Sequence, residues 1–341
     1  MRFPSAPGQQ VGELKALLDR PRRIAIVTHY NPDGDAMGSS LGLMHVLKGL
    51  GHSAQVVLPN TPPAFLRWMP GFDQALALDK QKERTLGAIA ECELLFCLDF
   101  NQTDRVGGLE VAVKAAPLKV LIDHHQEPGA IATIQFSDTA ACSTSQMVFD
   151  ILSAMGHGDH IGVEAATCLY TGIVTDSGSF RFSSTTPHTM RVAADLMERG
   201  VAVARVHEAI TDDNSLERLK LLGFTLNERL TVLPELDTAI ISLSRADLAR
   251  FDFQPGDTEG FVNYGLSIRG IRLAALFIER PDLVKMSLRS KGELAVDRFM
   301  KEHFNGGGHR NAAGGHTTAS LVAAVERFRS LLPTLIADHP E

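Results

Sequence analysis

Three short apolar segments of this sequence share one property: each ends in acidic residues or histidines. They are Arg23 to His29, Leu94 to Asp99, and Lys119 to Asp123 with His124 and His125 directly behind it. Stretches with helical periodicity lie between them, for example Ala36 to Leu50. Short apolar strands that alternate with helices predict a mostly parallel sheet with helices on both faces. The carboxyl ends of parallel strands lie on one edge of the sheet, so these polar residues should converge there.

Further segments predict two domains. A strand is expected at Ser53–Leu58, and helices are expected at Ser143–Met155, Ile161–Thr175, Pro187–Gly200 and Val203–Leu230, with a break at Asp212–Ser215. A second α/β unit follows, with strand candidates Ala239–Leu243, Ile271–Ile278 and Val284–Arg289 and a helix candidate Leu294–His303. A length of 341 residues accommodates two domains. We therefore predict a first α/β domain at 1–185, a mainly helical linker at 186–235 and a smaller α/β domain at 236–341.

Composition excludes several classes of protein. No apolar run approaches the ~20 residues of a membrane-spanning helix, and Met1 to Gln10 has no apolar signal core, so a cytoplasmic protein is expected. The four cysteines have no metal-ligand spacing, which favours reduced thiols over a disulfide framework. The formal net charge of −7 argues against broad binding to duplex nucleic acid. A small anionic substrate remains compatible with this charge if a local cationic site exists.

The turn after the first strand carries His29, Asp33 and Asp35, and Pro32 and Gly34 stiffen and sharpen it. Folding alone does not require two acids and a histidine there, whereas a divalent cation does. The full set of candidate metal ligands is His29, Asp33, Asp35, Asp99, His124 and Asp176. Each of them alone would more often be a turn residue, a helix cap or a satisfied histidine. Together, they come from four segments of one α/β unit, and this combination predicts a metal site.

These motifs resemble the DHH phosphoesterase family. The resemblance rests on His29-Tyr-Asn-Pro-Asp-Gly-Asp35, the strand that ends in Asp99, Asp123-His124-His125 and Asp176. Residues 306–314, Gly-Gly-Gly-His-Arg-Asn-Ala-Ala-Gly, look like the glycine-rich signature of the DHH-associated C-terminal domain. The layout is similar to stand-alone bacterial nanoRNases and pAp phosphatases, the NrnA type. The glycine-rich segment argues against the family II pyrophosphatases, which share only the first domain.

The resemblance implies a site with two Mn²⁺ ions, with Mg²⁺ or Co²⁺ as alternatives. One ion would be held by His29, Asp33 and Asp99, and the other by Asp35, Asp99, His124 and Asp176. His125 would act in catalysis by facing the scissile phosphate, and Asp123 would orient a neighbouring histidine. Substrate binding would involve Gly306, Gly307, Gly308 and His309, with Arg289 as a further candidate. The active site would lie in a cleft between the two domains.

The expected activity is hydrolysis of short oligoribonucleotides to 5′-mononucleotides and of pAp to AMP and phosphate. The enzymatic alternative is a phosphodiesterase for cyclic-di-AMP or pApA, and the alternative from another class is a noncatalytic nucleotide-binding sensor. Expected partners are short single-stranded RNA or small nucleotides, with no membrane and no long duplex. Whether the chain forms a homodimer is left open by the sequence.

Overall fold

The computed structural model describes residues 6–212 and 214–337. They form two compact units, Met1–Asp213 and Asn214–Glu341, which are described here one at a time. The segment 186–235, expected from the sequence to be a linker, is shared between the two units. Asp213, which is part of the predicted break at 212–215, lies outside the described residues. Residues 1–5, which are part of the segment expected to have no signal core, also lie outside them.

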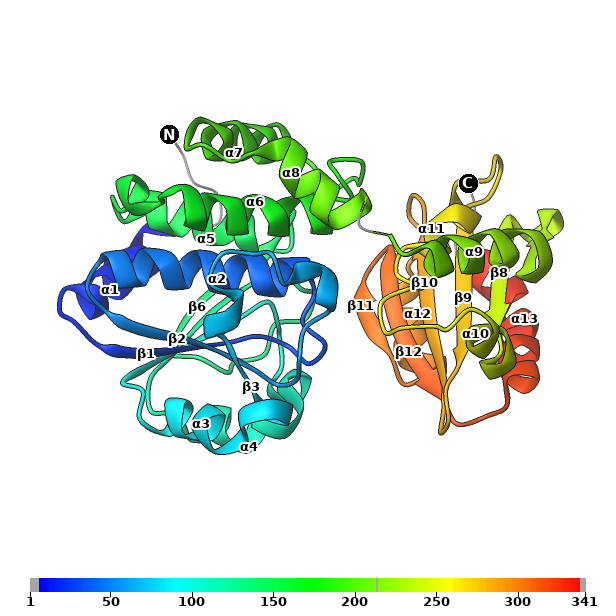
Figure 1. Cartoon of the computed structure of the whole chain (residues 1–341), viewed down its shortest axis with the longest axis horizontal. Coiled ribbons are helices and arrows are strands. Elements are labelled where there is room, and N and C mark those ends of the chain that lie inside the picture. The colour runs from blue at the N-terminus through cyan, green and yellow to red at the C-terminus, as the bar shows by residue number, and fades with distance from the viewer. Residues whose placement is uncertain (1–5, 213, 338–341) are drawn as a thin grey trace. The chain divides into compact units, whose positions relative to one another are not determined.

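A six-stranded parallel sheet forms the centre of the first unit, as predicted (Figure 1). Its spatial order is β3-β2-β1-β4-β5-β6. The strands are β1 (Arg23–Val27), β2 (Ser53–Leu58), β3 (Leu76–Ala77), β4 (Leu94–Leu98), β5 (Lys119–Asp123) and β6 (Ile134–Ser137). The chain runs outward from β1 in one direction and from β4 in the other. The strand order therefore reverses between β1 and β4, and ligands bind at such a switch point in open α/β sheets.

Helices cover both faces of this sheet. They are α1 (Gly8–Leu18), α2 (Gly34–Gly49), α3 (Leu78–Ala90), α4 (Glu110–Ala115), α5 (Thr144–Ala154), α6 (Val163–Asp176), α7 (Pro187–Glu198) and α8 (Val203–His207). Alternate residues of β1 point to opposite faces, because the side-chain period of a strand is two. Ile24 and Ile26 join the core beneath α1, α2, α5 and α6, whereas Ala25 and Val27 join the core beneath α3 and α4. Figure 1 shows α6 and α7 stacked beyond α2 as further layers.

Close packing between α2 and α6 depends on glycines. A Cβ atom on Gly38 would lie 2.6 Å from the carbonyl oxygen of Cys168, and one on Gly42 would lie 2.7 Å from Leu169 Cδ2. Only a residue without a side chain allows the two helices to approach this closely. This packing places the start of α2, with Asp35, next to the end of α6, with Asp176.

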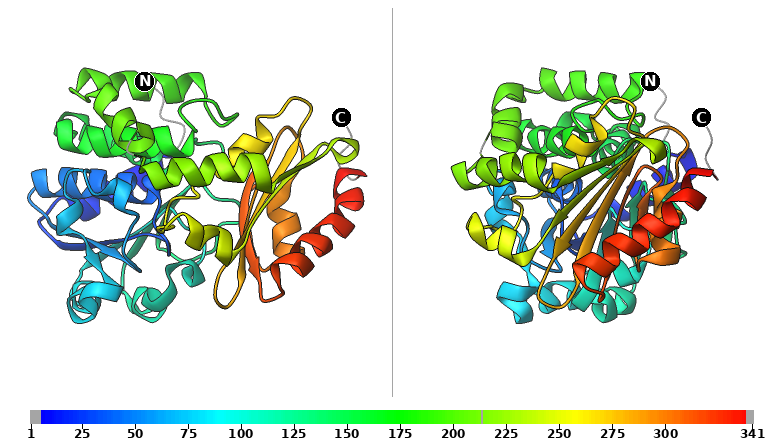
Figure 2. Two further views of the ribbon diagram at one scale, coloured as in Figure 1. Left: turned by 45° about the vertical axis from the view of Figure 1, so that its right-hand side comes forward. Right: turned by 90° about the vertical axis from the view of Figure 1, so that its right-hand side faces the viewer.

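The second unit is smaller than the first, and it contains a mixed sheet with helices on both faces (Figures 1 and 2). Its spatial order is β11-β12-β10-β9-β8-β7, and only β8 and β9 pair in parallel. The strands are β7 (Leu230–Leu233), β8 (Thr238–Leu243), β9 (Leu273–Glu279), β10 (Val284–Ser290), β11 (Gly307–His309) and β12 (Ala312–Thr317). The helices are α9 (Leu216–Phe224), α10 (Arg245–Arg250), α11 (Phe261–Leu266), α12 (Val296–His303) and α13 (Leu321–Ala337). Phe277 and Phe328 pack between the sheet and α12 and α13, whereas Phe261 of α11 belongs to the core on the other face.

Membrane and cysteine expectations can be compared with the described residues. Among them, no helix is both long and apolar enough to cross a bilayer. All four cysteines are buried and free. Burial raises the pKa of the Cys97 thiol to about 12, so this thiol is protonated at neutral pH.

An ion pair in the second unit provides a stability prediction. Arg229 donates to both oxygens of Asp247, through Nε at 3.0 Å and Nη2 at 2.8 Å, and Asp247 also accepts from Ser244 at the start of α10. The bond from Arg229 lowers the pKa of Asp247 to about 2. We expect Asp247→Asn to destabilise this unit by about 1–2 kcal/mol at pH 7.

The pH dependence of this effect follows from the direction of the shift. The folded pKa of about 2 lies below the unfolded value of about 3.9, so the stabilisation is present above pH 4 and is lost as the pH falls toward 2. The difference in Tm between the unsubstituted protein and Asp247→Asn should therefore shrink in acid. The control Asp282→Asn, at an exposed acid, should have nearly the Tm of the unsubstituted protein at every pH. A difference in Tm that stays constant from pH 7 to pH 2.5 would contradict this assignment.

Candidate metal centre

The six predicted ligands all lie in the first unit, at the carboxyl edge of its sheet. His29 follows β1, Asp99 follows β4, His124 follows β5, and Asp176 is the last residue of α6. Asp33 and Asp35 lie at the start of α2. The structure brings them into two groups, His29 with Asp33 and Asp99, and Asp35 with His124 and Asp176, and within each group the potential ligand atoms lie within 4.8 Å of one another. These groups match the sets that the resemblance implies, with Asp99 next to both, and their role as metal ligands stays a prediction.

Hydrogen bonds at Nδ1 set the tautomers of His29 and His124. The Nδ1 atom of His29 lies 2.9 Å from the carbonyl oxygen of Tyr30, and that of His124 lies 3.3 Å from the carbonyl oxygen of Ala141. A carbonyl oxygen only accepts, so Nδ1 carries the proton in both rings. The Nε2 atom of each ring then faces the carboxylates, and a divalent cation held between them would take the Nε2 lone pair.

Asp99 connects the two groups through its two oxygens. Its Oδ2 atom lies 3.5 Å from His29 Nε2, and its Oδ1 atom lies 3.5 Å from His124 Nε2. Both distances are longer than a hydrogen bond, which is expected of donor atoms that would share a bound cation. The backbone of Asp99 has a φ of 65°, a left-handed conformation that is uncommon outside glycine. Backbone strain of this kind is concentrated at functional sites.

The N-terminus of α5 orients two of the carboxylates. The backbone N–H groups of Thr144 and Ser145 donate to Asp35 at 2.6 and 2.9 Å, and the Thr144 hydroxyl donates to Asp99 Oδ1 at 2.9 Å. Neither Thr144 nor Ser145 was predicted from the sequence as a site residue. The available signal was the run Cys-Ser-Thr-Ser at 142–145, because hydroxyl residues in front of a helical segment mark exposed N–H groups.

Asp33 has a second function as the cap of α2. Its Oδ1 atom accepts from the backbone N–H groups of Asp35 and Ala36, each at 3.0 Å. The Asp33 side chain is 60 % exposed, whereas Asp35 and Asp99 are almost fully buried. The centre is therefore open to solvent on the side of Asp33.

The charge of the cluster fits divalent cations. Burial, together with repulsion from Asp99 and Asp176, raises the pKa of Asp35 well above its usual value. Burial also raises the pKa of Asp176 to about 6, and the neighbouring acids Asp33 and Asp99 act in the same direction. A cation placed among these carboxylates would relieve both burial and repulsion. Carboxylate oxygens combined with imidazole nitrogens suit Mn²⁺ and Zn²⁺, and carboxylate oxygens also suit Mg²⁺.

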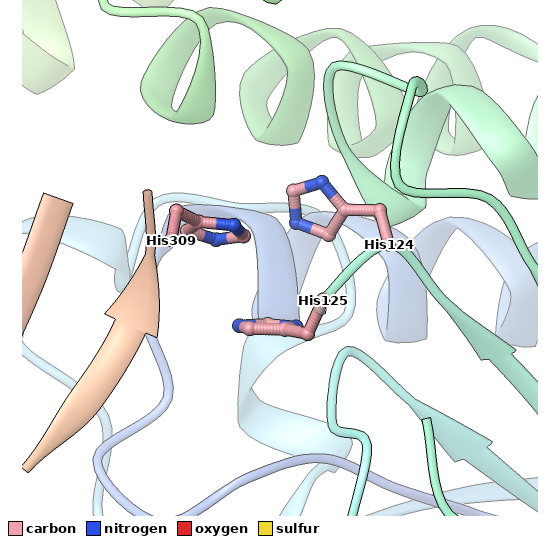
Figure 3. A group of neighbouring side chains, drawn as sticks. All are labelled: His124, His125 and His309. Atoms are coloured by element: carbon pink, nitrogen blue, oxygen red, sulfur yellow. The ribbon is translucent and has the colours of Figure 1, made fainter. Parts of the chain in front are cut away.

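His125 lies beside this cluster, and a carboxylate orients it. Its Nδ1 atom lies 2.7 Å from Asp123 Oδ1, and its backbone N–H donates to Asp123 Oδ2 at 3.2 Å. Asp123 is fully buried. The rings of His124 and His125 meet edge to face, with centroids 5.1 Å apart, and Figure 3 shows that they extend from the chain just after β5 in different directions. The two histidines therefore face different surroundings, as expected from adjacent residues at a strand end.

In the second unit, the glycine-rich segment forms β11 and its turn into β12. A Cβ atom on Gly308 would lie 2.5 Å from the carbonyl oxygen of Ala312, and the φ of Gly308 is 143°. Gly306 meets the backbone of Gly314 in the same way, so close strand packing accounts for both glycines. His309, at the end of β11 (Figure 3), and Arg289, in β10, are half-buried. The predicted roles of these residues in substrate binding stay predictions.

Comparison with known proteins gives matches over both units. Residues 23–173 match the DHH family, N-terminal domain, and residues 239–338 match the DHHA1 domain.

Relatives match over most of the chain. The bifunctional oligoribonuclease and PAP phosphatase NrnA of Thermus thermophilus is 32% identical over 304 residues, which cover 89% of this chain and 86% of the relative. The protein of the same name from Bacillus subtilis is 28% identical, over 93% of this chain and 95% of the relative. Among solved structures, an exopolyphosphatase-related protein from Bacteroides fragilis is 35% identical and superposes with a TM-score of 0.93, covering 97% of each chain.

Proposed function

This chain belongs to the DHH family, and on that premise we propose that it is a metal-dependent phosphoesterase acting on small nucleotides. The reactions we propose are hydrolysis of short oligoribonucleotides to 5′-mononucleotides and of pAp to AMP and phosphate. The observation that carries the proposal is the pair of Asp99 oxygens, each 3.5 Å from the Nε2 atom of a different histidine. This arrangement supports two adjacent cation sites that share one carboxylate. The similarity to two relatives named oligoribonuclease and PAP phosphatase supports the choice of substrates.

Two Mn²⁺ ions are the proposed cofactors, with Mg²⁺ or Co²⁺ as alternatives. His29, Asp33 and Asp99 would hold one ion, and Asp35, Asp99, His124 and Asp176 would hold the other. When bound, two such cations stabilise charge on a phosphoryl group and make water a better nucleophile at neutral pH. The protein contributes four carboxylates, whose total charge of about −4 balances two divalent cations. Thr144 and Ser145 keep two of these carboxylates oriented.

His125 is the proposed acid–base or hydrogen-bonding residue. Because its Nδ1–H donates to Asp123, its Nε2 atom is the one that can exchange a proton or a hydrogen bond with a phosphoryl or leaving-group oxygen. The buried Asp123 holds the orientation of the ring, which makes Asp123 a positioning residue.

Substrate binding by the second unit is a separate part of the proposal. His309 and Arg289 would bind a phosphate or a base, and no proposed metal ligand lies in this unit. We expect His309→Ala and Arg289→Ala to retain all bound Mn²⁺ and to lower kcat/KM for dinucleotides by about 10-fold. The matched control is Arg269→Ala, because Arg269 is an exposed arginine of the same unit. A loss of Mn²⁺, or unchanged kinetics in both variants, would contradict this placement of the binding residues.

Substrate length provides a further expectation. The first unit carries 17 Lys and Arg against 24 Asp and Glu, so the whole formal charge of −7 falls on the unit that holds the metal ligands. An extended basic track for a long backbone is therefore not expected beside the metal centre. We expect RNA of two to five nucleotides to be degraded much faster than a 24-mer, and duplex DNA to be nearly inert, at equal concentration of ends and fixed salt.

The experiment that tests the proposed function is one activity panel with Mn²⁺ on pAp, pApA, cyclic-di-AMP and RNA of two to twenty-four nucleotides. Hydrolysis of pAp and the shortest RNA supports the proposal. A clear preference for cyclic-di-AMP would replace it with the phosphodiesterase alternative. Equal or faster cleavage of the 24-mer would point to a processive exonuclease. A metal-loaded protein that binds nucleotides but cleaves none of them would indicate a sensor.

A further inference from the structure

An exposed aromatic ring directly follows one of the proposed metal ligands. Tyr30 is the next residue after His29, and it is 53% exposed. Large aromatic side chains more often bury their rings, because a ring of this size stabilises a fold mainly through the apolar area it removes from water. A large aromatic residue left exposed beside a proposed metal ligand is a candidate for contact with a ligand.

The backbone around Tyr30 is fixed on both sides. Its N–H group donates to the carbonyl oxygen of Arg105 at 2.6 Å, and its own carbonyl oxygen accepts from His29 Nδ1. The next residue, Asn31, has a φ of 57°, and it exchanges two hydrogen bonds with Asn60: Asn31 N–H donates to Asn60 Oδ1 at 2.7 Å, and Asn60 Nδ2 donates to Asn31 Oδ1 at 3.2 Å.

The ring itself lies against a glycine in the loop that follows Asp99. A Cβ atom on Gly107 would lie 3.1 Å from Tyr30 Cδ2 and 3.7 Å from Tyr30 Cγ, and Gly107 has a φ of 52°. The neighbouring residues Val106 and Leu109 are fully buried, which anchors this loop in the core. The ring therefore lies next to a backbone segment that is anchored in the core, while Tyr30 as a residue remains 53% exposed.

We propose that Tyr30 is the platform on which the base of a nucleotide stacks when the phosphate of that nucleotide lies at the metal centre. This inference rests on the proposed function, since it assigns the base-binding position of the same site. A flat ring on a backbone that is fixed by hydrogen bonds loses little conformational freedom when a ligand binds. Stacking accepts every base, because every base has a π face. The ligand class is therefore a nucleoside phosphate, with purines favoured by their larger overlap with the ring.

A purely structural function for this ring makes a different prediction. Because Tyr30 is an exposed residue, removing its ring should cost little stability, and binding of a nucleotide and of a sugar phosphate without a base should change alike. A stacking platform instead contributes only when the ligand carries a base. The comparison of a nucleotide with the same sugar phosphate without its base separates the two cases.

The test is equilibrium binding of AMP and of ribose 5-phosphate to the full chain with Mn²⁺, measured by calorimetry. We expect the protein to bind AMP at least about 5-fold more tightly than ribose 5-phosphate, and Tyr30→Ala to lose most of this preference. Tyr30→Phe should keep it, because the stacking face is retained. Tyr264→Ala, which removes an exposed tyrosine of the second unit, should also keep it.

Three results would overturn the inference: AMP that does not bind, AMP that binds no better than ribose 5-phosphate, or an AMP preference that Tyr30→Ala leaves intact. Melting curves of the variants show whether each remains folded. Hydrolysis of pApA is measured in parallel. If pApA is not cleaved while AMP binding still depends on Tyr30, the proposed function fails and the stacking assignment stands.

Discussion

Asp99→Asn should abolish hydrolysis, with kcat/KM for a dinucleotide falling by at least about 10³-fold. The substitution removes the negative charge that the two proposed cation sites share, and it leaves an amide that cannot bridge two cations. Asparagine is close to aspartate in size and tolerates the left-handed backbone found at this position, where φ is 65°. The loss should therefore reflect the metal centre and not misfolding. The measurement is turnover together with bound Mn²⁺ per chain, which should fall below that of the unsubstituted protein.

Asp104→Asn is the matched control for this prediction. Asp104 is an exposed acid five residues after Asp99, in the segment that follows β4. Its substitution should leave both turnover and Mn²⁺ content close to those of the unsubstituted protein. Near-normal turnover in Asp99→Asn, or full Mn²⁺ content with lost turnover, would show that Asp99 does not bridge two cations.

His125→Ala should have the second largest effect, a fall in kcat of about 10²- to 10⁴-fold with Mn²⁺ content unchanged. The reason is that His125 is beside the metal ligands without being one of the six, and its ring is oriented by the buried Asp123. Asp123→Asn should produce a smaller loss of about 10- to 100-fold, because it disturbs the orientation of the ring but keeps the ring itself.

Turnover and metal content are again measured together for these variants. His160→Ala, which removes an exposed histidine of the same unit, is the control and should be unaffected. Loss of Mn²⁺ in His125→Ala would make His125 a metal ligand. Unchanged kcat would remove its proposed role in catalysis.

The first unit could be predicted from the sequence because its signals are local. Each of the four central strands, β2, β1, β4 and β5, is an apolar run bounded by polar residues. The strands β2 and β5 begin and end at the predicted residues. The clustering of the six proposed metal ligands could be predicted for the same reason, since a parallel sheet brings the ends of its strands to one edge. The two-residue strand β3 and the edge strand β6 were not predicted, because such short segments have no apolar periodicity that can be recognised.

Features that depend on distant contacts could not be predicted. The donation from Thr144 and Ser145 to Asp35 joins residues more than 100 positions apart, and nothing in the local sequence specifies that partner. Substrate binding by Gly306 and Gly308 stays a prediction, and the close strand pairing that both glycines make possible was not predicted. The sequence predicts helix over Val203–Leu230 with a break at Asp212–Ser215, and α9 does start directly after its cap Ser215, but the π-helical turns at Glu208–Asp212 and Thr225–Arg229 were not predicted.

The most direct test of the central claim is a crystal structure of the protein grown with Mn²⁺, with anomalous difference density measured at the manganese edge. We predict two peaks in the first unit. One should contact His29, Asp33 and Asp99, and the other should contact Asp35, Asp99, His124 and Asp176. A single peak, two peaks that do not share Asp99, or no peak among these residues in crystals of active protein would contradict the account.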